Sequence, residues 1–353
     1  MTAQPYLSIV GWARNDGYTD DYIARVSAAL RLLVRQLDRH RIASELVIVE
    51  WNPPSDRPLM SKLLTFPQGD SHVTVRFVTV DGRFHRGSRG WQARGMHGSN
   101  AANVGLRRAR GKFVTSKAID TFYSEALVRQ IGAANLDEQA VYRCDRLDVT
   151  AKAGWLEQPD ELLLKELARN TVLRHDRLVQ SNLWKIRDLH TNACGDFMLM
   201  SAKIWHAIRG FPKDPTVLCM DADSIALHAA AAHGAREVYW QGDRNILKIL
   251  HGNTHSQRTA TVWKDWQRFL DSYVFAKDYP ELAIKLRIWL DYPRRRVRGM
   301  EDILAPSIER SFLAKAIRYA QNDTSLVTNS PDWGLANENL PEQILIRASW
   351  DTA

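Results

Sequence analysis

The first third of the chain alternates continuous apolar runs with a segment whose apolar residues recur at helical spacing. Positions 6–12 (YLSIVGW), 45–50 (ELVIVE) and 73–80 (VTVRFVTV) are apolar runs that predict buried strands. Between the first two runs, apolar residues recur every three to four positions, which predicts an amphipathic helix. That stripe consists of Ile23, Val26, Leu30, Leu33, Val34 and Leu37. The alternation predicts an α/β fold with a mostly parallel, doubly wound sheet flanked by helices.

A second helix and strand follow and end in an acidic turn. Positions 100–111 predict a helix that ends at Gly111, and positions 112–116 (KFVTS) predict a short strand. Asp120 comes directly after that strand. The segment 81–98 is rich in Gly, Arg and His, and we expect it to be a loop.

The rest of the chain predicts further strands and then helices. Positions 141–149 and 238–250 have strand-like patterns, and positions 157–189 predict mostly helix and polar loop. Positions 201–208 predict another helix. The last hundred residues, with several tryptophans, are expected to be helical.

Composition excludes several classes of protein. The chain has 353 residues, enough for a large core, and three scattered cysteines, which fits a reducing cytoplasm. No apolar run reaches the ~18 residues of a membrane span, and the N-terminus does not resemble a secretory signal. The net charge of +8 suits an anionic ligand or an acidic membrane surface. Without a nucleic-acid-binding module, nucleic acid is not an expected partner.

Polar side chains follow three of the predicted strands. Arg14 and Asp16 follow the first, Glu50 and Asn52 end the second, and Asp120 follows the strand at 112–116. Open α/β sheets bind ligands at the carboxyl ends of their strands, where carboxylates can hold ribose or base and cations can hold phosphate. The usual glycine-rich phosphate loops are absent from the sequence. For Asp120, capping of the next helix is the alternative.

The second half offers acids and histidines as candidates. Asp196 lies at the start of a strand, and Asp221 and Asp223 precede a helix, where one of them could be a general base or a helix cap. His251 and His255 follow the strand that ends near residue 250. They are candidates for metal or phosphate contact, with an ordinary surface histidine as the alternative.

Several segments together carry a resemblance to a known family. They are ELVIVEWNPP, AANVGLRRARGKFVTSKAID, and CGDFMLMSAKIWHAIRGFP followed by MDADSIALHAAAAHG. In this order they resemble GT-A type glycosyltransferases, close to the large inverting family 2 group. The chain further resembles a bacterial subgroup of uncharacterised GT-A proteins in the segments EWNPP, HTNACGDF, HGNTH and NSPDWGLANENLPE. The resemblance implies a Rossmann-like GT-A domain at 1–256, with a nucleotide-sugar half at 1–125, an acceptor half at 126–256, and a helical C-terminal extension at 257–353.

The resemblance also implies roles for the candidate residues. The nucleotide-sugar contacts would be Arg14, Asp16, Glu50, Asn52, Asn103, Arg107 and Asp120. The acceptor contacts would be Asp196 and Trp184, and the catalytic base would be Asp223, with Asp221 beside it. The metal ligands would be Asp120, His251 and His255. The implied reaction moves a sugar from a nucleotide-sugar donor to a hydroxyl acceptor with inversion, in glycan or polysaccharide biosynthesis.

The sequence departs from the family at its metal motif. Ala118 stands where the D-x-D motif has its first carboxylate, so that only Asp120 remains. Mg²⁺ or Mn²⁺ could still bind to one carboxylate and phosphate oxygens. The competing prediction is metal-independent transfer with Lys117, or arginines of the segment 81–98, covering the phosphates. A non-catalytic GT-A-like protein that binds an anionic polymer or the inner membrane face through the basic run 294–298 is the alternative function.

Overall fold

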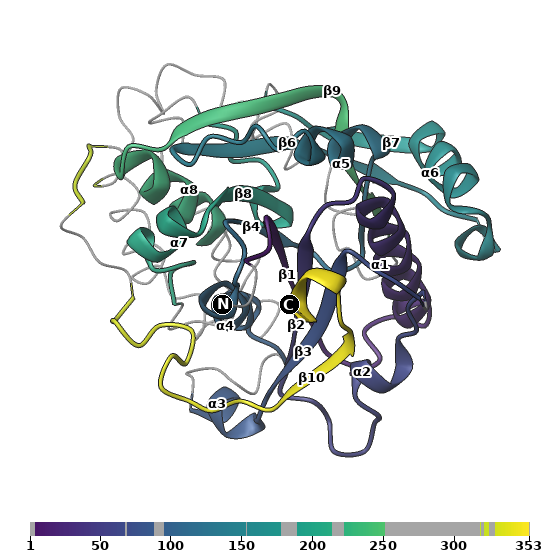
Figure 1. Cartoon of the computed structure of the whole chain (residues 1–353), viewed down its shortest axis with the longest axis horizontal. Coiled ribbons are helices and arrows are strands. Elements are labelled where there is room, and N and C mark those ends of the chain that lie inside the picture. Colours follow the sequence, from purple (N-terminus) through teal and green to yellow (C-terminus); the bar gives the residue numbers. More distant parts are fainter. Residues whose placement is uncertain are drawn as a thin grey trace, which may run out of the picture.

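A ten-stranded sheet forms the centre of the computed structural model (Figure 1). The structure describes residues 4–67, 69–87, 95–152, 154–177, 189–213, 222–250, 318, 321–324 and 329–352. The strands are β1 (Leu7–Ala13), β2 (Ser44–Trp51), β3 (Val73–Val80), β4 (Phe113–Lys117), β5 (Thr121–Tyr123), β6 (Ala140–Val149), β7 (Thr171–His175), β8 (Phe197–Ser201), β9 (Arg236–Ile249) and β10 (Glu342–Ile346). The α-helices are α1 (Tyr22–Arg39), α2 (Met60–Leu63), α3 (Gly82–Arg86), α4 (Gly98–Arg108), α5 (Glu125–Gly132), α6 (Asp160–Arg169), α7 (Ala202–Ile208) and α8 (Ala222–Ala232). Short 3₁₀ turns are η2 (Trp155–Glu157), η3 (Cys194–Asp196) and η4 (Ser349–Thr352).

The strand order is β10-β3-β2-β1-β4-β8-β6-β9-β5, with β7 paired to β6. Strands β3, β2, β1 and β4 are parallel, so their carboxyl ends lie at one edge. Strand β8 is antiparallel to β4, and its first residue, Phe197, pairs with Lys117 at the end of β4. The beginning of β8 therefore lies at the same edge as the ends of β1, β2 and β4. This confirms the predicted α/β sheet flanked by helices.

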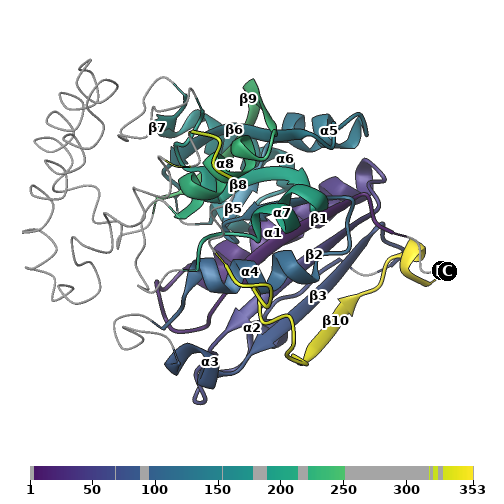
Figure 2. The ribbon, with the colours of Figure 1, turned by 90° about the vertical axis from the view of Figure 1, so that its left-hand side faces the viewer.

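The helices cover both faces of the sheet (Figures 1 and 2). Helices α4, α7 and α8 pack on one face, where alternate strand residues such as Val10, Val47 and Val49 contribute to the core. Helices α1 and α5 pack on the other face against the intervening residues, including Ile9 and Ile48. The strands are thus apolar on both faces, because both faces are covered.

The end of the chain returns to the sheet. Strand β10 pairs antiparallel with β3, and the indole nitrogen of Trp350 donates to the carbonyl of His72 at 2.8 Å. The prediction of a helical C-terminal extension is therefore wrong for residues 342–346. The alternating pattern of a short edge strand is weak, and tertiary pairing with β3 decides its structure. Residues 257–317 lie outside the described residues.

Three further elements differ from the sequence prediction. The expected loop at 81–98 contains α3, which Asp81 caps by accepting from the N–H of Arg83 at 2.7 Å. Strands β5 and β7 are additional, and both add to the sheet through other strands, β9 and β6. Among the described helices, none is long and apolar enough to cross a membrane.

Candidate functional site

The carboxyl ends of β1 and β2 bring together three of the predicted nucleotide-sugar residues. The Nε of Arg14 donates to the carbonyl of Asn52 at 2.7 Å, and its Nη1 donates to Asp16 at 2.7 Å. Asn52 adopts a left-handed conformation (φ 49°), and its amide donates to the carbonyl of Gly95 at 2.9 Å. An added Cβ at Gly95 would collide with the Arg14 guanidinium. Arg14, Asp16 and Asn52 therefore form one polar cluster at this edge.

Glu50, a fourth predicted nucleotide-sugar contact, has a different environment. Its side chain is fully buried, and its carboxylate accepts from the backbone N–H of Met60 at 2.7 Å, at the start of α2. Burial raises the pKa of Glu50, and the backbone hydrogen bonds from Met60 and Ser61 oppose that shift. In this structure Glu50 fixes α2 to the end of β2, and it has no surface for a ligand.

Asp120 lies beyond the end of β4, beside a buried arginine. Its carboxylate is 3.5 Å from Arg25 of α1, whose side chain is fully buried and also hydrogen-bonds Asp21. Asp120 itself is 7% exposed. The sequence analysis missed Arg25, although the spacing of Asp21 and Arg25 fits a helical ion pair. The buried arginine gives the carboxylate of Asp120 a cationic neighbour.

Lys117, the last residue of β4, shapes the turn that carries Asp120. Its ammonium donates to the carbonyls of Ala118, Ile119 and Thr121 at 3.0, 3.1 and 2.5 Å. Burial lowers the pKa of Lys117 to about 7, against the opposing effect of Asp120 and Asp196. The side chain is 1% exposed, so the prediction that Lys117 covers donor phosphates is wrong for this conformation.

Asp196, a predicted acceptor contact, belongs to an ion-pair network at the beginning of β8. Its carboxylate lies 2.6 Å from Arg146 and 3.9 Å from Lys248. Burial alone would raise the pKa of Asp196, but the charges of Lys248 and Arg146 outweigh it and lower the pKa to about 2. Arg146 also pairs with Asp148, which in turn contacts His175 at 2.8 Å. Asp196 is therefore an ionised carboxylate, already partnered by two cations.

Asp223, the predicted base, lies in the first turn of α8 and contacts η3. One carboxylate oxygen accepts from the N–H of Gly195 at 2.7 Å, and the other accepts from the N–H of Ser224 at 2.9 Å. A Cβ at Gly195 would lie 2.9 Å from the first oxygen, so the contact requires glycine. The partly exposed Asp223 is thus joined to the turn that also carries Asp196.

Asn103 and Arg107, the other two predicted nucleotide-sugar residues, contact other parts of the chain: Asn103 the residues after α7, and Arg107 the segment 329–335 near the C-terminus. The Asn103 amide donates to the carbonyl of Phe211 at 2.8 Å and accepts from its N–H at 2.7 Å. The Arg107 guanidinium lies 5.2 Å from the centre of the Trp333 ring. Asn103 is 3% exposed, so its side chain joins α4 to the chain after α7 rather than facing a ligand.

Several predicted residues lie outside the described residues. These are Asp221, Trp184, His251, His255 and the basic run at 294–298. Within the described part of the chain, no group of three or more His, Cys, Asp or Glu side chains could hold a metal ion. Of the predicted metal ligands, Asp120 alone is described.

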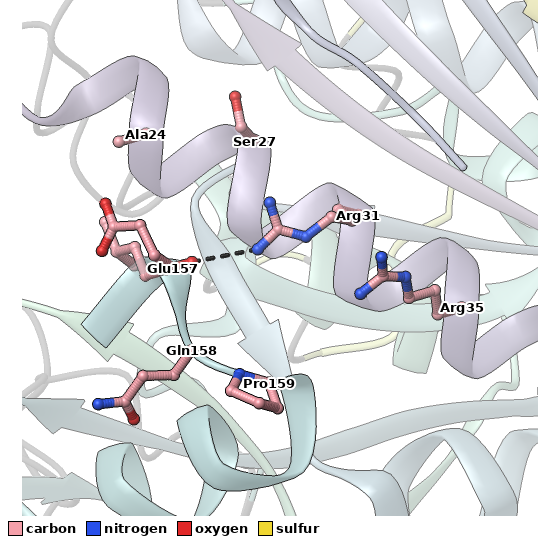
Figure 3. Close-up of a pocket in the computed structure, with 8 residues that line it drawn as sticks. Ala24, Ser27, Arg31, Arg35, Glu157, Gln158 and Pro159 are labelled. Atoms are coloured by element: carbon pink, nitrogen blue, oxygen red, sulfur yellow. Dashed lines mark hydrogen bonds between the residues drawn. The ribbon is translucent and has the colours of Figure 1, made fainter. Parts of the chain in front are cut away.

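One cavity lies away from the predicted residues, between α1 and residues 156–159. Its volume is about 550 Å³, and Figure 3 shows side chains that line it. Arg31 donates to the carbonyl of Leu156 at 3.1 Å, and Arg35 pairs with Asp160 at 3.0 Å. None of the described candidate site residues lines it. We therefore locate the candidate site at the sheet edge.

Among the comparisons with known proteins, only the comparison with solved structures found similar chains. No protein-family model matches the chain, and no curated protein matches its sequence. The chain is similar to the crystal structure of S. aureus TarS 1–349, with 12% identity, a TM-score of 0.39, and coverage of 90% of this chain and 91% of that chain. It is also similar to S. aureus TarS 1–349 in complex with UDP, with 13% identity, a TM-score of 0.42, and coverage of 91% and 89%.

Proposed function

We propose that this chain is a glycosyltransferase that transfers a sugar from a nucleotide-sugar donor to a hydroxyl acceptor, with inversion. One observation carries the proposal. Lys117 ends the strand before Asp120, and it pairs with Phe197 at the start of β8. The turn just before Phe197 contains Gly195, whose N–H donates to Asp223. Candidate donor residues and a candidate base thus come to one sheet edge, where open α/β folds bind ligands. The family 2-like order of the sequence segments supports the same reaction.

The polar cluster at β1 and β2 is the proposed nucleoside and diphosphate contact. Arg14 supplies a guanidinium, a good partner for phosphate oxygens, while Asp16 and Asn52 can accept from or donate to ribose and base. Arg14 now pairs with Asp16 and donates to the backbone carbonyl of Asn52, and the Asn52 amide donates to the carbonyl of Gly95. A bound nucleotide would replace some of these contacts with its own.

The proposed chemistry is a single displacement at the anomeric carbon. A carboxylate of the Asp221 and Asp223 pair takes the proton from the acceptor hydroxyl, and that oxygen forms a bond to the anomeric carbon. The bond from this carbon to the diphosphate breaks, and the nucleoside diphosphate leaves with the bonding electron pair. The products are the inverted glycoside, the nucleoside diphosphate and one proton, which the carboxylate releases to water.

A divalent cation fits this site only with help from the substrate. Asp120 is one carboxylate with an arginine beside it, and Mg²⁺ often binds to one or two carboxylates plus phosphate oxygens and water. We propose that Asp120 holds Mg²⁺ or Mn²⁺ together with the donor diphosphate. When bound, the cation would neutralise negative charge on the leaving group.

A thermal-shift screen of nucleoside diphosphates with and without Mn²⁺ tests the donor site. A ligand at one hundred times its dissociation constant stabilises a protein by about 2.7 kcal/mol, so the right diphosphate should raise the Tm by several degrees. Asp120→Asn should remove the part of the shift that depends on Mn²⁺. Asp160→Asn, which removes a paired carboxylate beside α1, is the matched control. No shift with any diphosphate would refute the donor site.

Transfer assays with single variants test the base. Replacing the catalytic base by asparagine should lower kcat by roughly 10²- to 10⁴-fold, while nucleotide binding persists. Comparing Asp221→Asn with Asp223→Asn identifies which carboxylate takes the proton. Full turnover in both variants would refute the acid–base step.

A further inference from the structure

A cavity of about 240 Å³ opens between α3, the first half of α4 and residues 329–335. The proposed function gives it no role, because Arg14, Asp16, Asn52 and Asp120 do not line it. Its volume is below the roughly 300–1,000 Å³ of sites for drug-sized ligands. It therefore has room for a single ring.

Aromatic side chains form the walls of this cavity. They come from three separate segments: Trp51 at the end of β2, Phe84 in α3, and Trp333 in the C-terminal segment. The Arg107 guanidinium and the His206 ring, 5.2 and 5.5 Å from the ring of Trp333, hold that indole in place. Trp51 and Trp333 are only 2% and 5% exposed and leave little surface for a ligand, so the partly exposed Phe84 offers the aromatic surface against which a small ring can pack.

Two asparagine side chains fix the shape of the cavity through hydrogen bonds to the backbone. Asn329 donates to the carbonyls of Arg209 and Phe211 at 2.6 and 2.7 Å, and it accepts from the N–H of Lys213 at 2.8 Å. Asn103 makes its two hydrogen bonds to the backbone of Phe211. The cavity is therefore built from a rigid contact between α4, the chain after α7 and the C-terminal segment.

Charged side chains stand at the rim. Among the described lining residues, Arg83 and Lys213 are cations and Asp332 is the one carboxylate. The Arg83 side chain is 67% exposed and lies 3.5 Å from Glu338, so it can turn toward a ligand. A hydrogen bond from Ser330 lowers the pKa of Asp332, which keeps this carboxylate ionised and able to accept from a hydroxyl. The rim thus favours a ligand that has both an anionic group and hydroxyl groups.

We infer that this cavity binds one sugar ring that carries an anionic group. This inference does not depend on the proposed function. The ring packs against the side chain of Phe84, while Arg83 and Lys213 hold the anionic group through charge-assisted hydrogen bonds and Asp332 accepts from a ring hydroxyl. The anionic group is a phosphate or a carboxylate.

Ligand-observed NMR titrations of the full chain test this inference. Glucose 1-phosphate and glucuronate represent the two anionic groups, and glucose and inorganic phosphate represent the separate parts of the ligand. At least one anionic sugar should bind about tenfold more tightly than either part, the gain expected when one further charge-assisted hydrogen bond is made. Which of the two binds identifies the anion. Equal binding of glucose and the anionic sugars, or no binding of either anionic sugar, would overturn the inference.

Variants and competition distinguish this cavity from the donor site. The double variant Arg83→Met and Lys213→Met should lose the binding, while Lys203→Met, which removes an 83% exposed lysine of α7, should retain it. All three substitutions remove exposed cations, so folding is not at risk. Saturating nucleoside diphosphate should leave the affinity for the anionic sugar unchanged. Displacement by the diphosphate, or unchanged binding in the double variant, would overturn the inference. Failure of the proposed function has a different signature, because it would abolish the nucleotide thermal shift and leave this binding intact.

Discussion

Replacement of Gly195 by alanine should disturb Asp223 directly. The new Cβ would lie 2.9 Å from a carboxylate oxygen of Asp223 and 3.2 Å from its Cβ. Real side chains do not tolerate the first distance, so the Asp223 side chain must move and lose its 2.7 Å hydrogen bond from Gly195. Overpacking typically costs about 1–3 kcal/mol, and a hydrogen bond to a charged group contributes roughly 1.5–3 kcal/mol. We expect a total loss on the order of 3 kcal/mol.

Calorimetry and a transfer assay measure the two consequences of Gly195→Ala. A loss of ~3 kcal/mol in a chain of this size should lower the Tm by roughly 4 °C. A carboxylate displaced by ~1 Å should lower kcat on the order of 100-fold if Asp223 acts in the reaction. Gly132→Ala is the control, because its Cβ would meet the flexible end of the Ile42 side chain at 3.0 Å, away from the site.

A double-mutant cycle shows whether the effect of Gly195→Ala is transmitted through Asp223. In an Asp223→Ala background the carboxylate is gone, so that Gly195→Ala should cost much less stability than in the natural chain. Residues in contact show coupling energies of about 0.5–3 kcal/mol. The reasoning would be refuted by additive effects in this cycle, or by a Gly195→Ala protein with the Tm and kcat of Gly132→Ala.

Three further variants test buried charges and contacts in the sheet and beside the site. Glu45→Gln breaks a buried pair with Arg76 at 3.0 Å and should lower the free energy of unfolding, measured in urea, by roughly 3–5 kcal/mol. Glu342→Gln, whose carboxylate also pairs with Arg76 but is 38% exposed, should cost about 1 kcal/mol or less. Equal costs would contradict this account. The pKa of Lys117 is lowered to about 7 in the folded chain, below the ordinary lysine pKa of about 10.4. Between these two pH values the unfolded chain therefore binds more protons than the folded chain. The free energy of unfolding should rise with pH across that range. Lys117→Met should remove this rise, and identical pH slopes in both proteins would disprove it. Asn103→Leu should lower the Tm, because two hydrogen bonds are lost, but the rise in Tm caused by the nucleotide should persist. Loss of that rise would show that Asn103 contacts the nucleotide.

The apolar pattern of the sequence was sufficient to predict the central strands and the helix of α1. Strands buried on both faces produce continuous apolar runs, and a helix on one face produces an apolar stripe, so both signals are local. Strand β10 was missed because its pairing with β3 joins positions about 265 residues apart. No local pattern specifies such a partner.

The ionic partners around the site could not be predicted from the sequence. Arg25 and Arg146 resemble ordinary surface arginines in the sequence, yet one is fully buried beside Asp120 and the other binds Asp196 at 2.6 Å. Gly195 is similarly plain in sequence, and only its 2.7 Å contact with Asp223 explains the glycine. Each of these roles depends on a tertiary contact between separate elements.

Position relative to the strand ladder explains which strand-end residues remain available to a ligand. Glu50 pairs with Ala13 and Thr79, and Lys117 pairs with Phe197, so both are inside the ladder. Their side chains are at most 1% exposed and bind neighbouring backbone groups.

Residues outside the ladder have more freedom. Arg14 and Asn52 follow the last paired residues of β1 and β2, Asp196 precedes the first of β8, and Asp120 comes three positions after β4. All four retain some exposure or face another charged side chain across the edge. A polar residue that ends an apolar run is therefore a good candidate for ligand contact only when it lies past the last paired position. This criterion removes Glu50 and Lys117 and retains Arg14, Asn52 and Asp120 as the residues to test first.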